Sequence, residues 1–319
     1  MTSRMIPFKI AVPDLISNSY FPAITASELG LFKGQGLDAS IDLIFPVNKS
    51  YLALREGGVD CVAGSAHSAL AAFPEWQGVK LVCAQAQGMY WFLVMRSDIG
   101  CARGDVGAVK GRKIGAAAWV DLGLKQLLVA AGIDEKRDDV TIMPVPNTGS
   151  PSSNFGLMAA KALEEALIDG FWANGMGAEV AVRSGAGRII LDIRRGDGPS
   201  ECFNYTMASI AVTDTFIAKH PGVADRITTA MNDTHAALKK NPALAETVGR
   251  KVFPDREASL IQALVQRDLP YYSTEISPRF VEGMNAFARK RGILKGDVAY
   301  GSIVSNGGRT SAGTADPSL

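Results

Sequence analysis

Apolar and polar positions follow two alternating periods along the chain. Short apolar runs bounded by Gly, Pro, Asp or Asn have the length and composition of strands, whereas apolar positions spaced three and four residues apart indicate helices between them. The predicted strands are residues 8–12, 39–45, 60–64, 79–85, 89–97, 111–119, 140–145, 169–174, 188–193 and 206–212. This alternation is typical of an α/β protein.

The clearest amphipathic helix lies in the middle of the chain. Leu124, Leu127, Leu128 and Ala131 recur at helical spacing, and Gly132 follows as a C-terminal cap. Further helices are predicted from Phe21, around Leu52 and Leu54, over 66–73 and 155–168, and, in the C-terminal third, from Pro221, over 256–267 and from Pro278 to Gly292. Two series of strands and helices followed by a helical third indicate two lobes.

Composition and charge narrow the classes of partner. Lys and Arg number 33 against 32 Asp and Glu, so the net charge of +1 argues against a nucleic acid or an anionic membrane surface as the main partner. No segment reaches the about 18 uncharged apolar residues of a transmembrane helix. Residues 1–17 lack the apolar core of a secretory signal, so we expect a cytoplasmic protein, or a periplasmic one whose leader was removed.

Candidate metal and cofactor chemistry is sparse. The cysteines Cys61, Cys83, Cys101 and Cys202 show no CxxC or CxxH spacing and are expected to be free thiols. The sequence contains no GxxxxGK[ST], HExxH, GxSxG or complete GxGxxG motif. The histidines have no ligand spacing, and we expect neither a metal nor a cofactor.

Six sequence runs, taken in order, resemble a known family. They are ITASELGLFKGQGLD, LREGGVDCVAGSAHSAL, KGRKIGA, ALEEALIDGFWAN, FIAKHPGVADRI and ISPRFVEGMNAFARKRGIL, and the likeness extends over residues 8–296. In order and spacing they resemble the type II periplasmic substrate-binding proteins. The closest branch is the nitrate, sulfonate and taurine group, with its relatives that bind the thiamine pyrimidine precursor.

The resemblance implies a two-lobed Venus-flytrap fold with mixed sheets flanked by helices. It implies that a ligand binds in the cleft between the lobes and that the lobes close on it by hinge motion. The implied boundaries are residues 1–97 and 206–301 for the first lobe and 98–205 for the second. Residues 302–319 are polar and rich in Gly and Ser, which predicts a disordered tail.

Polar loops at strand ends supply the candidate binding residues, because ligands of doubly wound sheets bind beyond the carboxyl ends of strands. In the first loop, Ser17, Asn18 or Ser19 is expected to cap the next helix, and spare hydroxyls and rings are expected to contact ligand. The candidates from the four loops are Asp14, Ser17, Asn18, Ser19 and Tyr20; Ser65 and His67; Trp119 and Asp121; and Trp172 and Asn174.

Each of these residues also has a structural interpretation. His67 is more simply a neutral hydrogen-bonding residue than a metal ligand. Asp121 is most simply a first-turn carboxylate, although facing the ligand it would disfavour an anion and favour an N–H donor. Trp172 fits either the core or the cleft. Tyr90, Trp91 and Tyr205 complete a possible aromatic wall, in which strand alternation lets only one of Tyr90 and Trp91 face the cleft.

These candidates are aromatic, hydroxyl and amide groups without Arg or Lys, which predicts a planar, weakly charged aromatic or heterocyclic ligand. We therefore expect a monomeric solute-binding protein that delivers a small molecule to an ABC-importer permease. An alternative is an enzyme, since the scaffold also resembles the aromatic sulfinate desulfinase, whose nucleophilic cysteine aligns with Ser17. His67 would then be the base. A ligand sensor is a third possibility.

Overall fold

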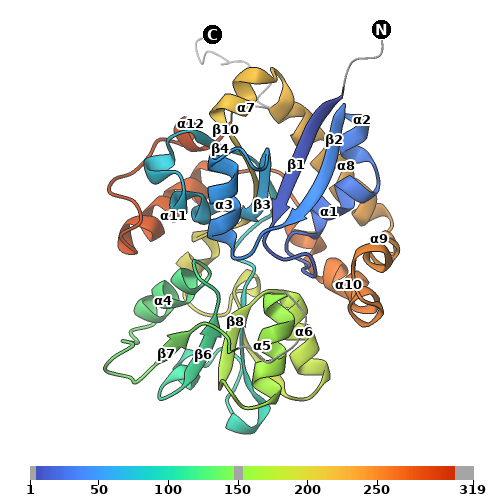
Figure 1. The fold of residues 1–319 in the computed structure, drawn as a ribbon. Coiled ribbons are helices and arrows are strands. Elements are labelled where there is room, and N and C mark those ends of the chain that lie inside the picture. The colour runs from blue at the N-terminus through green and yellow to red at the C-terminus, as the bar shows by residue number, and fades with distance from the viewer. Residues whose placement is uncertain (1–4, 147–153, 306–319) are drawn as a thin grey trace, which may run out of the picture.

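The computed structural model describes residues 5–146 and 154–305. These residues form two lobes, each built on a five-stranded mixed sheet flanked by helices (Figure 1). The α/β, two-lobed architecture predicted from the sequence is therefore confirmed.

The two sheets share one topology. The strands are β1 (Ile6–Val12), β2 (Leu37–Leu43), β3 (Cys61–Ser65), β4 (Val79–Ala86), β5 (Phe92–Arg96), β6 (Lys113–Ala116), β7 (Thr141–Met143), β8 (Gly170–Ala173), β9 (Gly187–Asp192) and β10 (Ala208–Thr213). The first sheet has the order β2-β1-β3-β10-β4, and the second β7-β6-β8-β5-β9. In each sheet three parallel strands are followed by an antiparallel strand that enters from the other lobe, β10 in the first and β5 in the second.

The helices of the first lobe outnumber those of the second. They are α1 (Phe21–Glu28), α2 (Leu31–Gly34), α3 (Val47–Arg55), α7 (Asp214–Lys219), α8 (Val223–Lys240), α9 (Leu244–Val252), α10 (Asp255–Asp268), α11 (Pro278–Lys290) and α12 (Tyr300–Ile303). The second lobe carries α4 (Asp121–Ala130), α5 (Phe155–Glu164) and α6 (Gly175–Arg183). The helix α9 was not predicted, and residues 66–71 form a 3-10 helix.

Alternation along β1 explains why helices cover both faces of the first sheet. Ile10 and Val12 pack into a core that includes Met231 of α8, whereas Ala11 faces a separate core with Tyr51 of α3. A strand that is buried on both faces has no polar side, which accounts for the nearly continuous apolar sequence of the central strands.

The strand β5 corrects the predicted lobe boundary at residue 97. It lies between β8 and β9 of the second sheet, with Leu93 opposite Trp172 and Leu191. Its residues 92–95 are buried, so the strand needs a partner on each side, and the second sheet supplies both. The chain therefore crosses between lobes before Phe92.

The first crossing depends on a glycine. Gly88 has a φ of 74°, in the left-handed region, and a Cβ placed on it would lie 2.4 Å from the ring of Phe203 on the return crossing. The Met89 N–H donates a 3.0 Å hydrogen bond to the carbonyl of Phe203. The two connections thus run side by side, as a hinge requires.

The predicted disordered tail begins too early. Ile303 of α12 is buried, and Val304 pairs with Leu81 at the end of the first sheet. These apolar residues anchor the chain as far as Ser305, and the rest of the predicted tail lies outside the described residues. No helix in residues 5–146 and 154–305 is long and apolar enough to cross a membrane.

Candidate ligand-binding site

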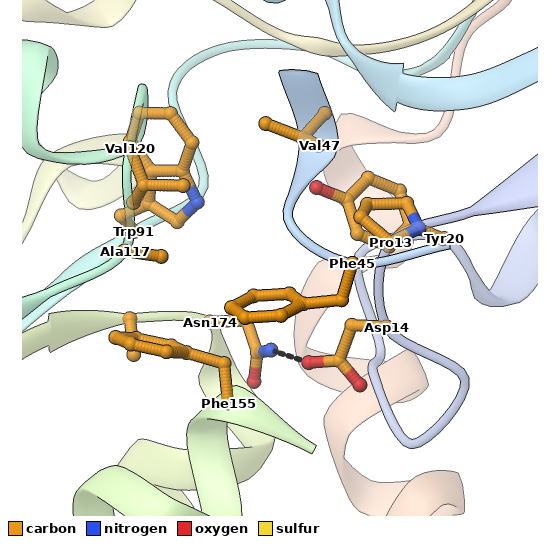
Figure 2. A pocket seen from close by; sticks show the side chains of 11 residues that line it. Pro13, Asp14, Tyr20, Phe45, Val47, Trp91, Ala117, Val120, Phe155 and Asn174 are labelled. Atoms are coloured by element: carbon orange, nitrogen blue, oxygen red, sulfur yellow. Dashed lines mark hydrogen bonds between the residues drawn. The ribbon is translucent and has the colours of Figure 1, made fainter. Parts of the chain in front are cut away.

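A cleft with a cavity volume of about 40 Å³ lies between the two lobes, and Figure 2 shows it from close by. The first lobe contributes strand-end and loop residues, and the second contributes residues at the starts of α4, α5 and α6. The lining consists of Pro13, Asp14, Tyr20, Phe45, Val47, Trp91, Ala117, Val120, Phe155, Ala173 and Asn174. This location, beyond the carboxyl ends of β1, β2, β6 and β8, is where α/β sheets bind ligands.

Aromatic rings from both lobes meet across this cleft. Phe45 follows β2 and Phe155 begins α5, and their rings are stacked with centroids 6.1 Å apart and an interplanar angle of 22°. Trp91 faces into the cleft opposite Tyr20 and Val47 (Figure 2). Flat apolar walls of this kind favour a planar ligand.

Asp14 is the acidic residue of the cleft, and both its oxygens accept hydrogen bonds from asparagines. The Asn174 side-chain amide donates to Oδ2 at 2.7 Å, and the Asn154 amide donates to Oδ1. Burial raises the pKa of Asp14 to about 7, because desolvation outweighs the hydrogen bonds from Asn174 and the Ile16 backbone, which lower it. The carboxyl group is therefore held between its neutral and charged forms near neutral pH.

None of the cleft-lining residues above is Lys, Arg or His. An anionic ligand would therefore meet one buried carboxyl group and no compensating cation in the described part of the cleft. A charge placed in such a site without a partner costs several kcal/mol, on the order of the penalty for other buried ions. The lining therefore suits a neutral or cationic group.

Four predicted site residues line the cleft, namely Asp14, Tyr20, Trp91 and Asn174. Tyr90 lies behind this surface, where its hydroxyl and that of Tyr20 are hydrogen-bonded at 2.9 Å. Of the adjacent pair, Trp91 thus faces the cleft and Tyr90 is in the core, in keeping with the alternation argument.

The loop after β1 does not cap α1 in the way predicted. The N-cap residue is Tyr20, and no side chain makes a capping hydrogen bond. Ser17 accepts a hydrogen bond from the Ser19 N–H at 3.1 Å instead, and Asn18 donates to Asp268. Pro22 stands in the first turn, so one amide that a cap would satisfy is missing.

Three predicted aromatic or hydroxyl contacts are core or lobe-internal contacts. Trp172 is fully buried, and its indole nitrogen has no hydrogen-bond partner among the described residues. Tyr205 stacks on Phe287 with centroids 4.7 Å apart. The Ser65 hydroxyl is paired with that of Ser68 at 2.6 Å. Strand alternation and local packing turn these side chains away from the cleft lining.

In the loop before α4, the residues that line the cleft are not the predicted Trp119 and Asp121. Trp119 has a φ of 72°, and its carbonyl lies 3.0 Å from Nε2 of His67 in the other lobe. Asp121 is a first-turn carboxylate of α4 and pairs with Lys125 at 2.6 Å. The adjacent Ala117 and Val120 line the cleft instead.

The predicted Ser17–His67 pair is not assembled. The Ser17 hydroxyl accepts from the Ser19 N–H, and His67 contacts the Trp119 carbonyl through Nε2, while its Nδ1 has no hydrogen-bond partner in residues 5–146 and 154–305. Burial lowers the pKa of His67 to about 4, partly offset by that carbonyl and by Asp121. Neither residue lines the cleft described above, so the geometry does not place His67 as a base beside a Ser17 nucleophile.

Sequence reasoning missed Phe45, Val47, Phe155 and Asn154. Phe45 follows the strand parallel to β1, so its position at a carboxyl strand end was a usable signal. Asn154 and Phe155 follow a polar loop whose residues 147–153 lie outside the described part. Their position opposite Asp14 depends on how the two lobes pack, so no pattern in the neighbouring sequence indicates it.

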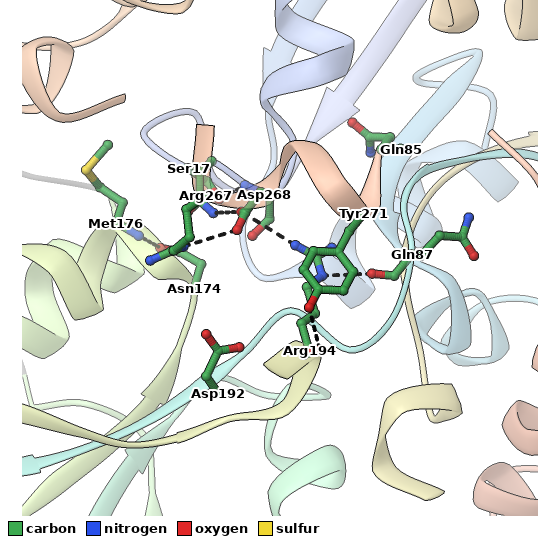
Figure 3. Close-up of polar contacts among 12 residues, drawn as sticks. Ser17, Gln85, Gln87, Asn174, Met176, Asp192, Arg194, Arg267, Asp268 and Tyr271 are labelled. Carbon is green, nitrogen blue, oxygen red and sulfur yellow. Dashed lines mark hydrogen bonds and ion pairs between the residues drawn. The ribbon is translucent and has the colours of Figure 1, made fainter. Parts of the chain in front are cut away.

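A second polar cluster joins the lobes beside the cleft (Figure 3). Asp268 of α10 contacts Arg194 after β9 at 3.5 Å and Arg267 at 3.1 Å. Arg194 also donates to the Gln87 carbonyl on the first crossing at 2.7 Å, and the Tyr271 hydroxyl donates to the Arg194 carbonyl at 2.6 Å. This cluster connects the first crossing and the segment after β9 to the C-terminal helices.

Solved structures of similar fold include a protein from Bordetella bronchiseptica RB50, with a TM-score of 0.73 and 20% identity over 96% of this chain and 92% of that one. The alkanesulfonate-binding protein SsuA from Xanthomonas axonopodis pv. citri, bound to MOPS, has a TM-score of 0.67 and 14% identity over 92% and 96%. A mutant of DSZB in complex with biphenyl-2-sulfinic acid has a TM-score of 0.63 and 14% identity over 95% and 97%.

No curated protein sequence matches the chain significantly. The family described as NMT1/THI5 like matches residues 17–245. The matched region begins in the loop after β1, takes in the whole second lobe and ends in α9. Since this region is most of the chain and includes both lobes, the protein belongs to the NMT1/THI5-like family.

Proposed function

We propose that this protein is a solute-binding protein that captures a small planar heterocycle in its interlobe cleft and delivers it to an ABC importer. The observation that carries the proposal is the cleft lining, in which four aromatic rings surround one buried carboxyl group and no Lys or Arg is present. Aromatic faces bind a flat ring, and Asp14 accepts from ring or exocyclic N–H groups.

The two-lobed geometry supports capture by closure. Phe45 belongs to the first lobe and Phe155 to the second, so a ring inserted between them contacts both lobes at once. A ligand that binds the closed state better than the open state shifts the population toward closure. We propose that Asp14, Tyr20, Phe45, Trp91, Phe155 and Asn174 are its contacts.

Delivery to a permease is the role supported by fold likeness to solved structures such as the periplasmic sulfonate-binding protein SsuA of a putative sulfonate ABC transporter from Methylobacillus flagellatus KT. In that role the protein would act as a monomer in the periplasm, and the permease would bind its closed form. The ligand of SsuA is a sulfonate, whereas the acidic cleft here favours an N–H-bearing ligand. The proposed role is therefore shared with these proteins and the ligand class is not.

A direct titration tests the ligand class. The purified protein is titrated by calorimetry with aminopyrimidines and other planar heterocycles, and separately with ethanesulfonate and nitrate. We expect saturable binding of an N–H-bearing heterocycle and none of the anions. Tighter binding of ethanesulfonate than of every heterocycle would reject the proposal.

The enzyme hypothesis is separated from binding by recovery of the ligand. Native mass spectrometry of the complex should return the heterocycle unchanged, and Ser17→Ala should bind it as the wild type does, because Ser17 is outside the cleft lining. A product fragment that disappears in Ser17→Ala would instead establish catalysis on this scaffold.

A further inference from the structure

Two helices of the second lobe point their N-termini at the same carboxyl group of the first lobe. Asn154 caps α5, with its Oδ1 accepting from the Leu157 N–H at 2.9 Å. Asn174 caps α6, with its Oδ1 accepting from the N–H groups of Met176 and Gly177 at 3.0 and 3.2 Å. Because each oxygen is engaged by its own helix, each amide NH₂ faces outward, and both donate to Asp14.

Close packing of two glycines brings these helix starts together. A Cβ on Gly177 would lie 2.7 Å from the Gly156 carbonyl oxygen, and a Cβ on Gly156 would lie 3.1 Å from Oδ1 of Asn174. The N-termini of α5 and α6 therefore converge, and their dipoles and the two amide donors act on one point.

A point surrounded by helix N-termini and N–H donors is a site for an anion, and here the protein fills it with a carboxyl group of its own. We propose that Asp14 is the specificity-determining residue that excludes anionic ligands from the cleft, by occupying the anion position between α5 and α6. The inference rests on the proposed function, whose ligand class it explains: with that position occupied, an incoming ligand meets an acceptor rather than donors.

Asp14 also bridges the lobes through these contacts. Its side chain is 5% exposed, and its partners lie 140 and 160 residues away, in the second lobe. The carboxyl group thus makes, within the chain, the interlobe contacts that an anionic ligand would make from outside. Removing it takes one acceptor away from the Asn174 amide and one from the Asn154 amide, which also donates to the Ile16 carbonyl at 3.2 Å.

The test replaces Asp14 by Ser and uses Asp42→Ser as the control. Asp42 is on β2, outside the cleft lining, and its only ion pair among the described residues is a long one with Lys9, so its replacement removes the same type of side chain away from the cleft. Sulfate and ethanesulfonate are titrated by calorimetry into the wild type and both variants, and the thermal midpoint is measured with and without each anion.

We expect Asp14→Ser to gain affinity for these anions by at least roughly tenfold, the scale of one hydrogen bond to a charged group, with a raised midpoint. The wild type and Asp42→Ser should show neither change. Equal anion binding by the wild type, or a cooperatively folded Asp14→Ser that gains none, overturns the inference. If Asp14→Ser does not fold, Asp14→Ala, which also vacates the position, must show the gain instead, and no gain there also overturns it.

These outcomes are distinguishable from failure of the proposed function. The anion titrations use sulfate and ethanesulfonate alone and need no heterocycle. If no heterocycle binds the wild type but Asp14→Ser acquires anion binding, the proposed ligand is wrong and the role of Asp14 stands. If a heterocycle binds the wild type and Asp14→Ser gains no anion affinity, the proposed ligand class stands and the role of Asp14 is wrong.

Discussion

The side-chain amide of Asn18 donates a 2.7 Å hydrogen bond to the carboxylate of Asp268, a residue 250 positions later in the chain. Asn18 belongs to the loop that leads to the cleft, and Asp268 ends α10 and pairs with Arg194 of the second lobe. All three side chains are at least nine-tenths buried. One carboxylate therefore links the cleft loop, the C-terminal helices and the crossing between the lobes.

Removing this carboxylate should be costly. In Asp268→Ala, the buried guanidinium of Arg194 loses its ion-pair partner, and such losses destabilise proteins by about 3–5 kcal/mol. We expect a drop of that size in the free energy of unfolding, measured by urea denaturation. The control is Asp297→Ala, whose pair with Arg289 is exposed and should matter by less than about 1 kcal/mol. Equal effects in the two variants would show that the cluster carries no special stability.

The ring of Phe45 should contribute to ligand affinity and little to folding. The side chain is 39% exposed and stacks on Phe155 across the cleft. Loss of one well-placed aromatic contact costs about 0.5–1.5 kcal/mol, so Phe45→Ala should weaken heterocycle binding by up to about tenfold. Leu167→Ala, an exposed apolar residue outside the cleft lining, is the calorimetric control. Unchanged affinity in Phe45→Ala would remove this ring from the binding surface.

Gly177 should resist substitution because of its neighbour and not because of its backbone angle. An added Cβ would meet the Gly156 carbonyl at 2.7 Å, a backbone atom that cannot swing away. Overpacking of this kind typically costs about 1–3 kcal/mol, and it would also displace the cap at Asn174. We expect Gly177→Ala to lower the thermal midpoint.

The helical control for that variant is Gly34→Ala. Gly34 lies in α2 with no atom within 4 Å of a Cβ placed on it. Alanine in a helix is favoured over glycine by up to about 1 kcal/mol, so this variant should be neutral or slightly stabilised. A Gly177→Ala protein as stable as Gly34→Ala would mean that the two helix starts separate easily.

His67 should make the protein sensitive to acid. Burial lowers its pKa in the folded state to about 4, against 6.5 for the unfolded chain. Below pH 6.5 the unfolded chain binds a proton that the folded protein does not, so this contribution to stability is present above pH 6.5 and is lost as the pH falls toward 4. The full shift corresponds to roughly 3 kcal/mol.

The measurement is the unfolding free energy of the wild type and His67→Gln from pH 7 to pH 4. The variant should lose less stability over this range. Burial of Asp14 acts in the opposite sense: its pKa of about 7 makes a contribution that is present below pH 3.8 and is lost as the pH rises toward 7. Comparing each variant with the wild type isolates one group, and parallel profiles for His67→Gln and the wild type would contradict the prediction for the histidine.

Local sequence pattern recovered most strands because each is a short apolar run that packs on a sheet whatever lies beyond it. It failed where a segment has two possible partners. The strand β5 reads as an extension of the first lobe, yet both of its neighbours are in the second. The sequence also shows no repeat, although the two sheets have the same topology. The shared topology is a property of how the backbones pair, and many different side-chain sequences are compatible with the same pairing.

The amino-acid sequence alone determined the two-lobed α/β class, the absence of cations among the candidate residues, and four of the side chains that line the cleft. Only the tertiary structure decided that Asp14 meets Asn154 and Asn174, and that Phe45 meets Phe155. The reason is physical. Residues that share a face of one helix or strand recur at a fixed spacing, so they can be identified from the sequence. Loops of different lobes meet only because the segments between them pack together, and no periodicity in the sequence indicates such a contact.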